Sequence, residues 1–184
     1  MNKIDPILKK NFSYAEKLFS EGKYHEAIKK YKEILIDYPK LVGVINNIGL
    51  AYECLNELEE SLKFYKKCSI AQPEEKIFIN NLANIFYKMK YYKNTIKEIN
   101  KSLLIDDSQI KIIEMKASCL ITLNLRNEAD SFFKKYSKNF IDNRFLNTLC
   151  GKNLINLNQH KLGLQFLKKG TGFIEFNENQ ITII

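Results

Sequence analysis

The chain has 184 residues, of which 45% are hydrophobic, and it carries a formal net charge of +8. Three prolines and seven glycines are too few for a linker-rich or disordered chain. Arginine occurs only at Arg126 and Arg144, so the positive charge is almost all lysine. Because arginine is the better residue for base and phosphate contacts, the composition disfavours specific nucleic-acid recognition.

No stretch approaches the roughly 18 consecutive apolar residues of a membrane span, and the N-terminal stretch lacks the apolar run of a signal peptide. The chain has four cysteines and no CxxC pair or histidine cluster, which argues against a zinc site. Unpaired cysteines beside apolar stripes are typical of a reducing compartment. The sequence therefore predicts a soluble cytoplasmic protein that holds no metal and no other cofactor.

The first predicted helix begins at Pro6, with Asp5 as its N-cap. Gly22 interrupts the helical pattern, and a second helix follows from Tyr24 to just before Pro39. Two helices joined by so short a link are expected to pack against each other as an antiparallel pair.

Residues 42–73 show the same organisation more clearly. Two stripes of apolar residues at spacings of three and four predict two helices, and Asn56-Glu57 separates them. Pro73 ends the second helix. The pattern recurs at about 34 residues along most of the chain, a period typical of helical repeat arrays.

Small and aromatic residues at set places in this period resemble the tetratricopeptide repeat (TPR) family. The residues that carry the resemblance are Ala15, Ala27, Gly49, Tyr52, Ala83, Ala117, Ala129 and Gly151. The resemblance implies repeat units near residues 8–41, 42–75, 76–109, 110–143 and 144–172. It also implies an all-α fold, a TPR-like α-solenoid of about five antiparallel helix pairs over residues 6–170.

The fourth unit departs from the family pattern. Lys116 takes a place that is usually large and apolar, Tyr136 takes a small one, and no proline closes the unit. We expect a two-residue slip before the fifth unit. Residues 173–184 are rich in β-formers around a turn-like Asn-Glu-Asn, which predicts a short C-terminal tail or a β-hairpin.

Nothing in the sequence predicts an enzyme. His25 and His160 each open the second helix of a unit and have no partner that would make them a general base. No phosphate-binding loop, nucleophile elbow or dinucleotide fingerprint is present. We therefore expect no catalytic residue.

In the TPR fold, the first helix of each unit lines a concave groove, so the resemblance implies peptide-binding residues there. These are Asn46, Asn47, Glu53, Asn80, Asn81, Asn84, Tyr87 and Lys88, and Leu50 and Ile77 share the face. Asn47 and Asn81 lie one repeat apart and resemble the asparagine ladder in the TPR arm of O-linked N-acetylglucosamine transferase. The competing interpretation is that an asparagine-rich sequence places polar residues on a wet surface.

The expected function is a non-catalytic protein–protein interaction module that binds an extended peptide or a partner helix, with an acidic partner favoured by the net charge. The alternative is a substrate-recruiting TPR arm of a transferase-type enzyme. RNA binding is a distant third and would use a stripe of lysines that recur on the second helices, such as Lys29, Lys63 and Lys97. The family's carboxylate clamp for chaperone C-termini is rejected, because only Asn47 fits among the five clamp places, which hold Phe12, Glu16, Asn47, Ile77 and Asn81. The sequence names neither the partner nor the oligomeric state.

Overall fold

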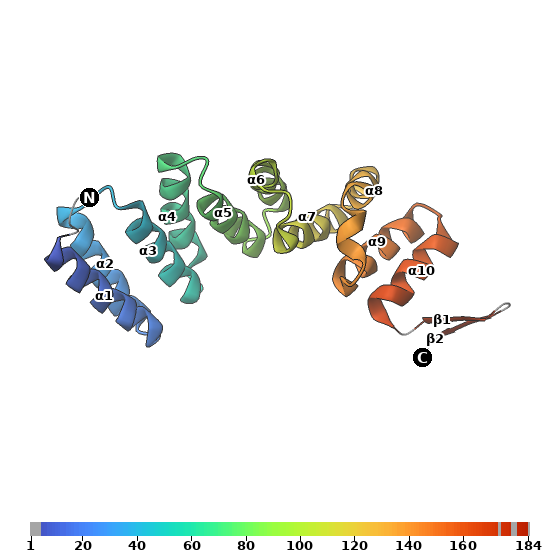
Figure 1. The fold of residues 1–184 in the computed structure, drawn as a ribbon, viewed down its shortest axis with the longest axis horizontal. Coiled ribbons are helices and arrows are strands. Elements are labelled where there is room, and N and C mark those ends of the chain that lie inside the picture. The colour runs from blue at the N-terminus through green and yellow to red at the C-terminus, as the bar shows by residue number, and fades with distance from the viewer. Residues whose placement is uncertain (1–4, 173, 178–179, 184) are drawn as a thin grey trace. The chain divides into compact units, whose positions relative to one another are not determined.

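The computed structural model describes residues 5–172, 174–177 and 180–183, and it divides the chain into two compact units. The N-terminal unit is Met1–Ile105 and the C-terminal unit is Asp106–Ile184. The described part of the chain holds ten α-helices, one 3-10 helix and two short strands (Figure 1). The predicted all-α fold is therefore confirmed, and of the two alternatives for the C-terminal residues, a tail or a β-hairpin, the structure has the paired strands.

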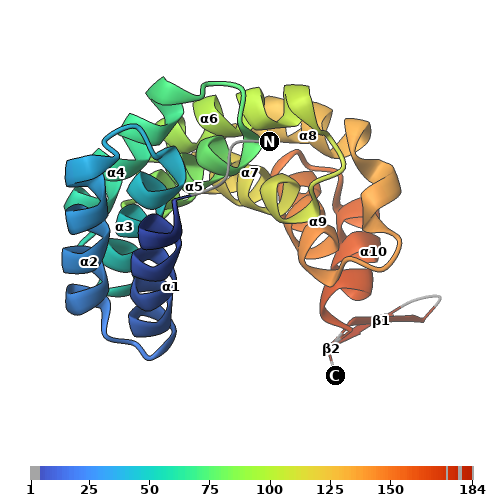
Figure 2. The same cartoon turned by 60° about the vertical axis from the view of Figure 1, so that its left-hand side comes forward.

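The N-terminal unit consists of three helix pairs. Its helices are α1 (Pro6–Ser20), α2 (Tyr24–Asp37), α3 (Val42–Cys54), α4 (Leu58–Ala71), α5 (Lys76–Lys88) and α6 (Tyr92–Ile105). Each helix packs against the next one in the chain, so α2 lies between α1 and α3, and α4 between α3 and α5 (Figure 2).

The start of α1 is set by local chemistry. The Asp5 carboxylate accepts a hydrogen bond of 2.8 Å from the Ile7 amide, and Pro6 occupies the first helical position. This satisfies one of the amides that have no partner within the helix. The Tyr38 hydroxyl at the end of α2 donates to the same carboxylate, so the cap also ties the two helices of the pair together.

One residue with a left-handed backbone lies in the turn between the two helices of each pair. Gly22, Asn56, Lys90, Asn124 and Asn158 have φ values of 76°, 60°, 63°, 56° and 61°. They are spaced 34 residues apart throughout. The expected two-residue slip before the fifth unit is therefore wrong. Asparagine and glycine tolerate this conformation, whereas lysine adopts it at a cost.

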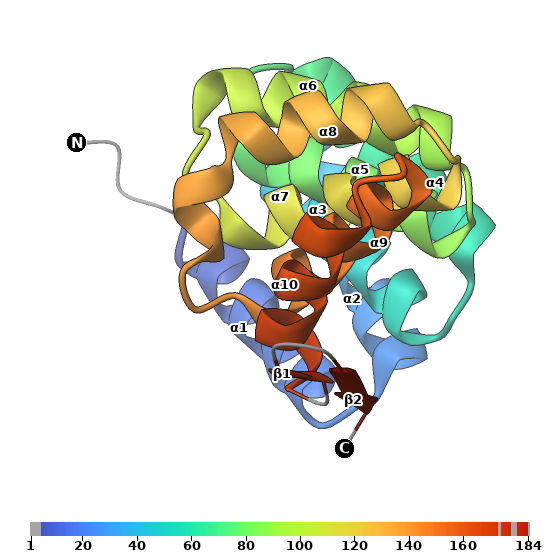
Figure 3. The same cartoon turned by 90° about the vertical axis from the view of Figure 1, so that its right-hand side faces the viewer.

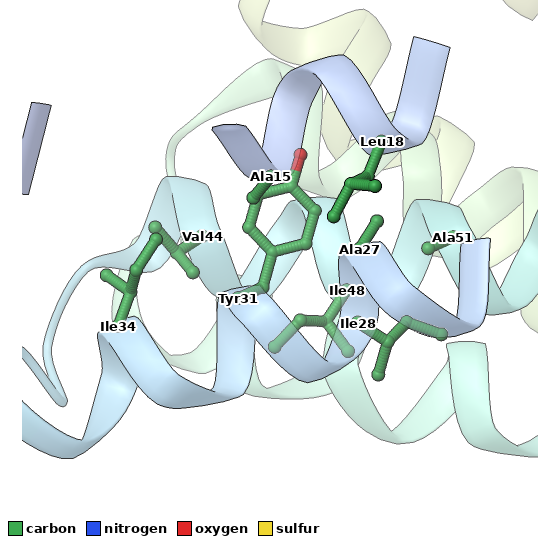
Figure 4. Close-up of a cluster of buried hydrophobic side chains, with 9 residues drawn as sticks. All are labelled: Ala15, Leu18, Ala27, Ile28, Tyr31, Ile34, Val44, Ile48 and Ala51. Carbon is green, nitrogen blue, oxygen red and sulfur yellow. The ribbon is translucent and has the colours of Figure 1, made fainter. Parts of the chain in front are cut away.

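The core of the N-terminal unit begins where α1, α2 and α3 meet. Tyr31 from α2 lies beside Ala15 of α1, with Ile34 and Val44 close by (Figure 4). Tyr31 and Ala15 expose none of their surface. Among the residues that carry the repeat pattern, all are buried except Tyr52, which is partly exposed: Ala15, Ala27, Gly49, Ala83, Ala117, Ala129 and Gly151.

The C-terminal unit also begins with paired helices. Its elements are α7 (Ile110–Thr122), α8 (Arg126–Lys135), the 3-10 helix η1 (Ser137–Phe140), α9 (Arg144–Asn156) and α10 (His160–Thr171), followed by the strands β1 (Ile174–Asn177) and β2 (Gln180–Ile183). The strands pair antiparallel with Ile174 opposite Ile183, and β1 follows and contacts α10 (Figure 3).

The divergence of the fourth unit has a structural counterpart in α8. This helix has 10 residues, and the chain continues as η1 instead of a further helical turn. Tyr136 caps α8 with its ring buried at 4.7 Å from the Phe132 ring. Lys116 places its ammonium 5.0 Å from the centre of the same Phe132 ring, and burial lowers the pKa of Lys116. A cation over an aromatic face thus replaces the usual apolar contact.

Two glycines of α3 provide a matched test of helix packing. A Cβ at Gly49 would lie 2.9 Å from ring atoms of the buried Tyr65, whereas a Cβ at Gly43 would meet nothing within 4 Å. We expect Gly49→Ala to lower the free energy of unfolding by about 1–3 kcal/mol through overpacking. Gly43→Ala should be neutral or stabilising by up to about 1 kcal/mol. Chemical denaturation measures both, and equal effects would contradict this packing.

The left-handed backbone at Lys90 provides a second test. Lys90 is exposed, so its replacement changes little besides the backbone preference. We expect Lys90→Gly to raise the free energy of unfolding by about 1 kcal/mol, because glycine adopts this conformation without steric cost. Lys93→Gly, in the first turn of α6, is the control and should destabilise. Thermal melts of the two variants check the prediction, and a loss of stability at Lys90 would contradict it.

Candidate functional site

A groove of about 540 Å³ crosses the first helices of the three pairs in the N-terminal unit. It is lined by Leu8, Lys9 and Phe12 from α1, by Leu41, Gly43, Val44, Asn46 and Asn47 at the start of α3, and by Ile77 and Phe78 from α5. The lining is mostly aliphatic and aromatic. Asn46, Asn47 and Lys9 supply its polar groups. Such a surface suits an apolar side chain whose backbone is held by a few amides.

The groove forms because the same early places of successive first helices face one way. Leu8 and Phe12 are one helical turn apart, so they share a face of α1. Ile77 in the first turn of α5 keeps 58% of its surface exposed, although it lies among apolar neighbours. An exposed isoleucine in a hollow costs hydration free energy that a bound side chain would recover.

A carboxylate on α1 organises one margin of this face. Glu16 accepts hydrogen bonds from the Asn47 amide, at 2.8 Å, and from the Tyr31 hydroxyl. Burial and the neighbouring Glu16 carboxylate both raise the pKa of Tyr31, so its hydroxyl stays a donor. The contact links α1, α2 and α3 through one side chain.

A second carboxylate, Glu53 on α3, has three donors around it. It accepts a hydrogen bond of 2.6 Å from the Tyr65 hydroxyl and one of 2.7 Å from the Asn84 amide. It also forms an ion pair of 2.7 Å with Lys88. Only 9% of the Glu53 side chain is exposed. Burial, followed by the hydrogen bond to Glu53, raises the pKa of Tyr65. Glu53 therefore ties α4 and α5 to α3.

The other predicted site residues divide between two directions. The Asn81 amide donates to the Asn46 oxygen at 2.7 Å, so these two lie together on the groove face. Asn80 instead accepts a hydrogen bond of 2.5 Å from the Ser102 hydroxyl of α6. The Tyr87 ring packs edge-on against the Tyr92 ring, with 5.9 Å between the ring centres. The structure thus brings Asn46, Asn47 and Asn81 near the groove, and it turns Asn80 and Tyr87 toward α6.

Glu53, Asn84 and Lys88 form a separate cluster on α3 and α5. Of the apolar lining, Ile77 was expected on this face, whereas Leu8 and Phe12 were missed because they have the pattern of core positions. The carboxylate contacts were also missed. The signal that could have found them is a glutamate on the first helix of a pair followed by a buried tyrosine on the second, as in Glu16 with Tyr31 and Glu53 with Tyr65.

Three of the four cysteines, Cys68, Cys119 and Cys150, are buried. Burial raises the pKa of the Cys68 thiol to about 11 and those of Cys119 and Cys150 to about 12, which keeps all three protonated near neutrality. Within residues 5–172 and the two strands, no three His, Cys, Asp or Glu side chains gather as a metal site requires. In the same part of the chain, no helix is long and apolar enough to cross a bilayer.

Comparison with protein families identifies the repeat. The family model described as "Tetratricopeptide repeat" matches residues 42–74, which are α3, α4 and the turn that follows. Residues 42–74 are a tetratricopeptide repeat. The resemblance predicted from the sequence is therefore confirmed.

Relatives among characterised proteins cover part of the chain. Hsp70-Hsp90 organizing protein of Triticum aestivum is 26% identical over 113 residues, which is 61% of this chain and 19% of that relative. Hsp70-Hsp90 organizing protein 2 of Arabidopsis thaliana is 26% identical over 112 residues, 61% of this chain and 20% of the relative. The chain spans about a fifth of the length of these relatives.

Solved structures match the fold over most of the chain. MamA 41-end from Desulfovibrio magneticus RS-1 aligns with a TM-score of 0.81 and 12% identity, covering 91% of this chain and 95% of that one. YrrB, described as a TPR protein with an unusual peptide-binding site, aligns with a TM-score of 0.78 and 17% identity, covering 93% and 87%. Together these likenesses confirm a TPR-like solenoid.

The hydrogen bond from the Tyr65 hydroxyl to the Glu53 carboxylate can be tested by mutation. We expect Tyr65→Phe to lower the free energy of unfolding by about 1.5–3 kcal/mol, because Glu53 loses a charge-assisted hydrogen bond in a nearly buried place. Tyr91→Phe, at a half-exposed ring, is the matched control and should change stability by less than about 0.5 kcal/mol. Urea denaturation gives both values. A Tyr65→Phe variant as stable as the control would show that this hydrogen bond contributes nothing.

Proposed function

We propose that this chain is a non-catalytic protein–protein interaction module, and that it binds an extended peptide or a partner helix in the groove of the N-terminal unit. The observation that carries the proposal is the open apolar hollow of about 540 Å³ that crosses α1, α3 and α5. The tetratricopeptide repeat at residues 42–74 supports an interaction role. The description of YrrB, a protein of similar fold, refers to a peptide-binding site.

The ligand that fits this groove carries an apolar anchor residue. Phe12, Val44 and Ile77 would surround the anchor, and the Asn46 and Asn47 amides would face the ligand backbone beside it. Lys9 is the cation of the lining, which favours an acidic residue next to the anchor. Glu53, Asn84 and Lys88 would extend the site toward the end of α5.

The groove does not suit a free C-terminal carboxylate. Two of the five places where the chaperone clamp needs polar or basic residues hold Phe12 and Ile77, which belong to the apolar lining. A third holds Glu16, whose negative charge would repel a carboxylate. The names of the relatives refer to Hsp70 and Hsp90, but these residues argue for a different ligand chemistry in this chain.

The alternative, a transferase arm that holds peptides on an asparagine ladder, has weaker support. The Asn47 and Asn81 amides already donate to Glu16 and Asn46. These hydrogen bonds fix the orientation of the two amides, so a ladder would have to use the second N–H and the oxygen of each amide. No arrangement of described residues favours RNA over a peptide.

The groove can be tested by peptide display. A random library is selected on the purified chain, and the enriched peptides are measured by fluorescence anisotropy. We expect peptides with a conserved apolar anchor, and we expect Ile77→Lys to weaken them at least about tenfold, since a charge would enter the hollow. Ile141→Lys in the C-terminal unit, at an 83% exposed isoleucine, is the matched control and should leave the affinity unchanged.

Two further results define the outcome. Asn47→Ala/Asn81→Ala should also weaken the selected peptides, because it removes the Asn47 amide beside the anchor and the Asn81 amide that holds the Asn46 side chain. If no peptide is enriched, or if Ile77→Lys and Ile141→Lys bind alike, the groove is not the binding site.

A further inference from the structure

Three large aliphatic side chains are exposed at equivalent places on the second helices of the N-terminal unit. Ile36 on α2, Ile70 on α4 and Leu104 on α6 expose 79%, 80% and 88% of their surface. They are spaced 34 residues apart, one per helix pair. Single exposed aliphatic residues are common, but one at the same place in every pair forms a repeated pattern. We name these three residues the apolar row.

A second repeated pattern accompanies the first. Lys29, Lys63 and Lys97 each precede a residue of the apolar row by seven positions on the same helix. Seven residues are nearly two helical turns, so each lysine shares a face with its aliphatic partner at about 10.5 Å along the axis. All three lysines are exposed, and Lys63 forms an exposed ion pair with Glu60. We name them the lysine row.

Composition alone does not explain the two rows. The C-terminal unit is built from the same kind of sequence, yet its residues at the places of the apolar row are Lys138 and Gly172. At the places of the lysine row it has Ser131 and Gln165. The combination therefore belongs to the N-terminal unit, where the three helix pairs pack one after another.

The surface beside the first member of the apolar row is hollowed. A depression of about 540 Å³ is lined by Ile28, Ile36, Lys29, Lys32 and Tyr52, among others. Lys32 donates a hydrogen bond of 3.0 Å to the Tyr52 hydroxyl across this depression. Glu33 also lines the depression, and its carboxylate forms a 2.7 Å ion pair with Lys30. The depression therefore offers an apolar wall with the ammonium groups of Lys29 and Lys32 at its edge, which suits a large side chain that has a carboxylate nearby.

The two sides of the apolar row differ in charge. The lysine row lies on the N-terminal side along each helix. Beyond the apolar row in the sequence, Asp37 ends α2, the turns after α2 and α4 hold Lys40, Glu74 and Glu75, and Lys76 opens α5. A flat anionic bilayer would attract one side and be partly repelled by the other. A helix can carry an acidic flank toward the lysine row and a second flank of different charge toward the mixed charges beyond the apolar row.

We propose that the apolar row and the lysine row together dock an amphipathic helix of a partner protein. The apolar stripe of that helix covers Ile36, Ile70 and Leu104, and its acidic flank faces Lys29, Lys63 and Lys97. A helix is about 10–12 Å wide with its side chains, so a helix whose stripe covers the apolar row extends one flank toward the lysine row, about 10.5 Å away. This surface is distinct from the groove on α1, α3 and α5, so the two sites are testable separately.

The test is a display library of helices of about 18 residues, five turns, with a leucine stripe and flanks randomised to Glu, Lys or Ser. Selection is made on the full chain. We expect enriched helices to carry Glu along one flank only. In fluorescence anisotropy, Ile36→Gln/Ile70→Gln/Leu104→Gln should weaken them at least about tenfold. Lys29→Glu/Lys63→Glu/Lys97→Glu should do the same and should favour a flank changed from Glu to Lys.

Two control variants separate this surface from others. Ile77→Gln alters the groove, and Ile141→Gln/Leu162→Gln alters exposed aliphatic residues of the C-terminal unit. Neither should change the affinity of the selected helices. Circular dichroism of each variant checks that the helices remain folded.

Three outcomes would overturn the proposal. The first is that the selection enriches no helix, or that the enriched helices bind the apolar-row variant and the parent with equal affinity. Another is sedimentation with phosphatidylserine vesicles that depends on both rows while no helix is enriched, which would assign the surface to a membrane. The last is self-association in analytical ultracentrifugation that the apolar-row variant abolishes, which would assign the surface to a second copy of the chain.

Discussion

The structure of the N-terminal unit depends on how closely the two helices of each pair approach. Gly49 on α3 lies against the ring of Tyr65 on α4, where a single additional carbon would be only 2.9 Å from the ring. Ala15 and Tyr31 stand in the same relation on α1 and α2 (Figure 4). A small residue therefore permits a buried aromatic ring to fill the space between helices at the density of a protein interior.

This packing also places the polar groups of the groove face. The rings of Tyr31 and Tyr65 are buried between the helices, and this places their hydroxyls beside Glu16 and Glu53. Each hydroxyl donates a hydrogen bond to the carboxylate next to it. The carboxylates then orient amides on the following first helix, through Asn47 and Asn84. Core packing and the arrangement of the candidate site are thus consequences of the same contact.

Much of the fold could be predicted because its determinants are local. Asp5 and Pro6 mark a helix start, and a period of 34 residues in small and apolar residues marks the pairs. The fourth unit was harder, since the contact of Lys116 with the Phe132 ring is an unusual substitute for an apolar pair. The kind of interaction that a lysine makes depends on its neighbours in space, which the pattern of one unit does not contain.

The candidate site was predicted less well than the fold. The sequence indicated which helix faces line it, but not the partner of each side chain. Asn46 and Asn80 occupy equivalent places, yet one bonds to Asn81 on the groove face and the other to Ser102 on α6. Leu8 and Phe12 have the pattern of core residues, and only the packed helices reveal that they border an open hollow. The site residues therefore remain a proposal.

The tight turns that close the helix pairs have a consequence for biosynthesis. Because Gly22, Asn56, Lys90, Asn124 and Asn158 each reverse the chain within a few residues, the two helices of a pair are neighbours in sequence as well as in space. Contacts between sequence neighbours form with little loss of chain entropy and make folding fast. Each pair can thus begin to assemble while the ribosome is still adding the next one.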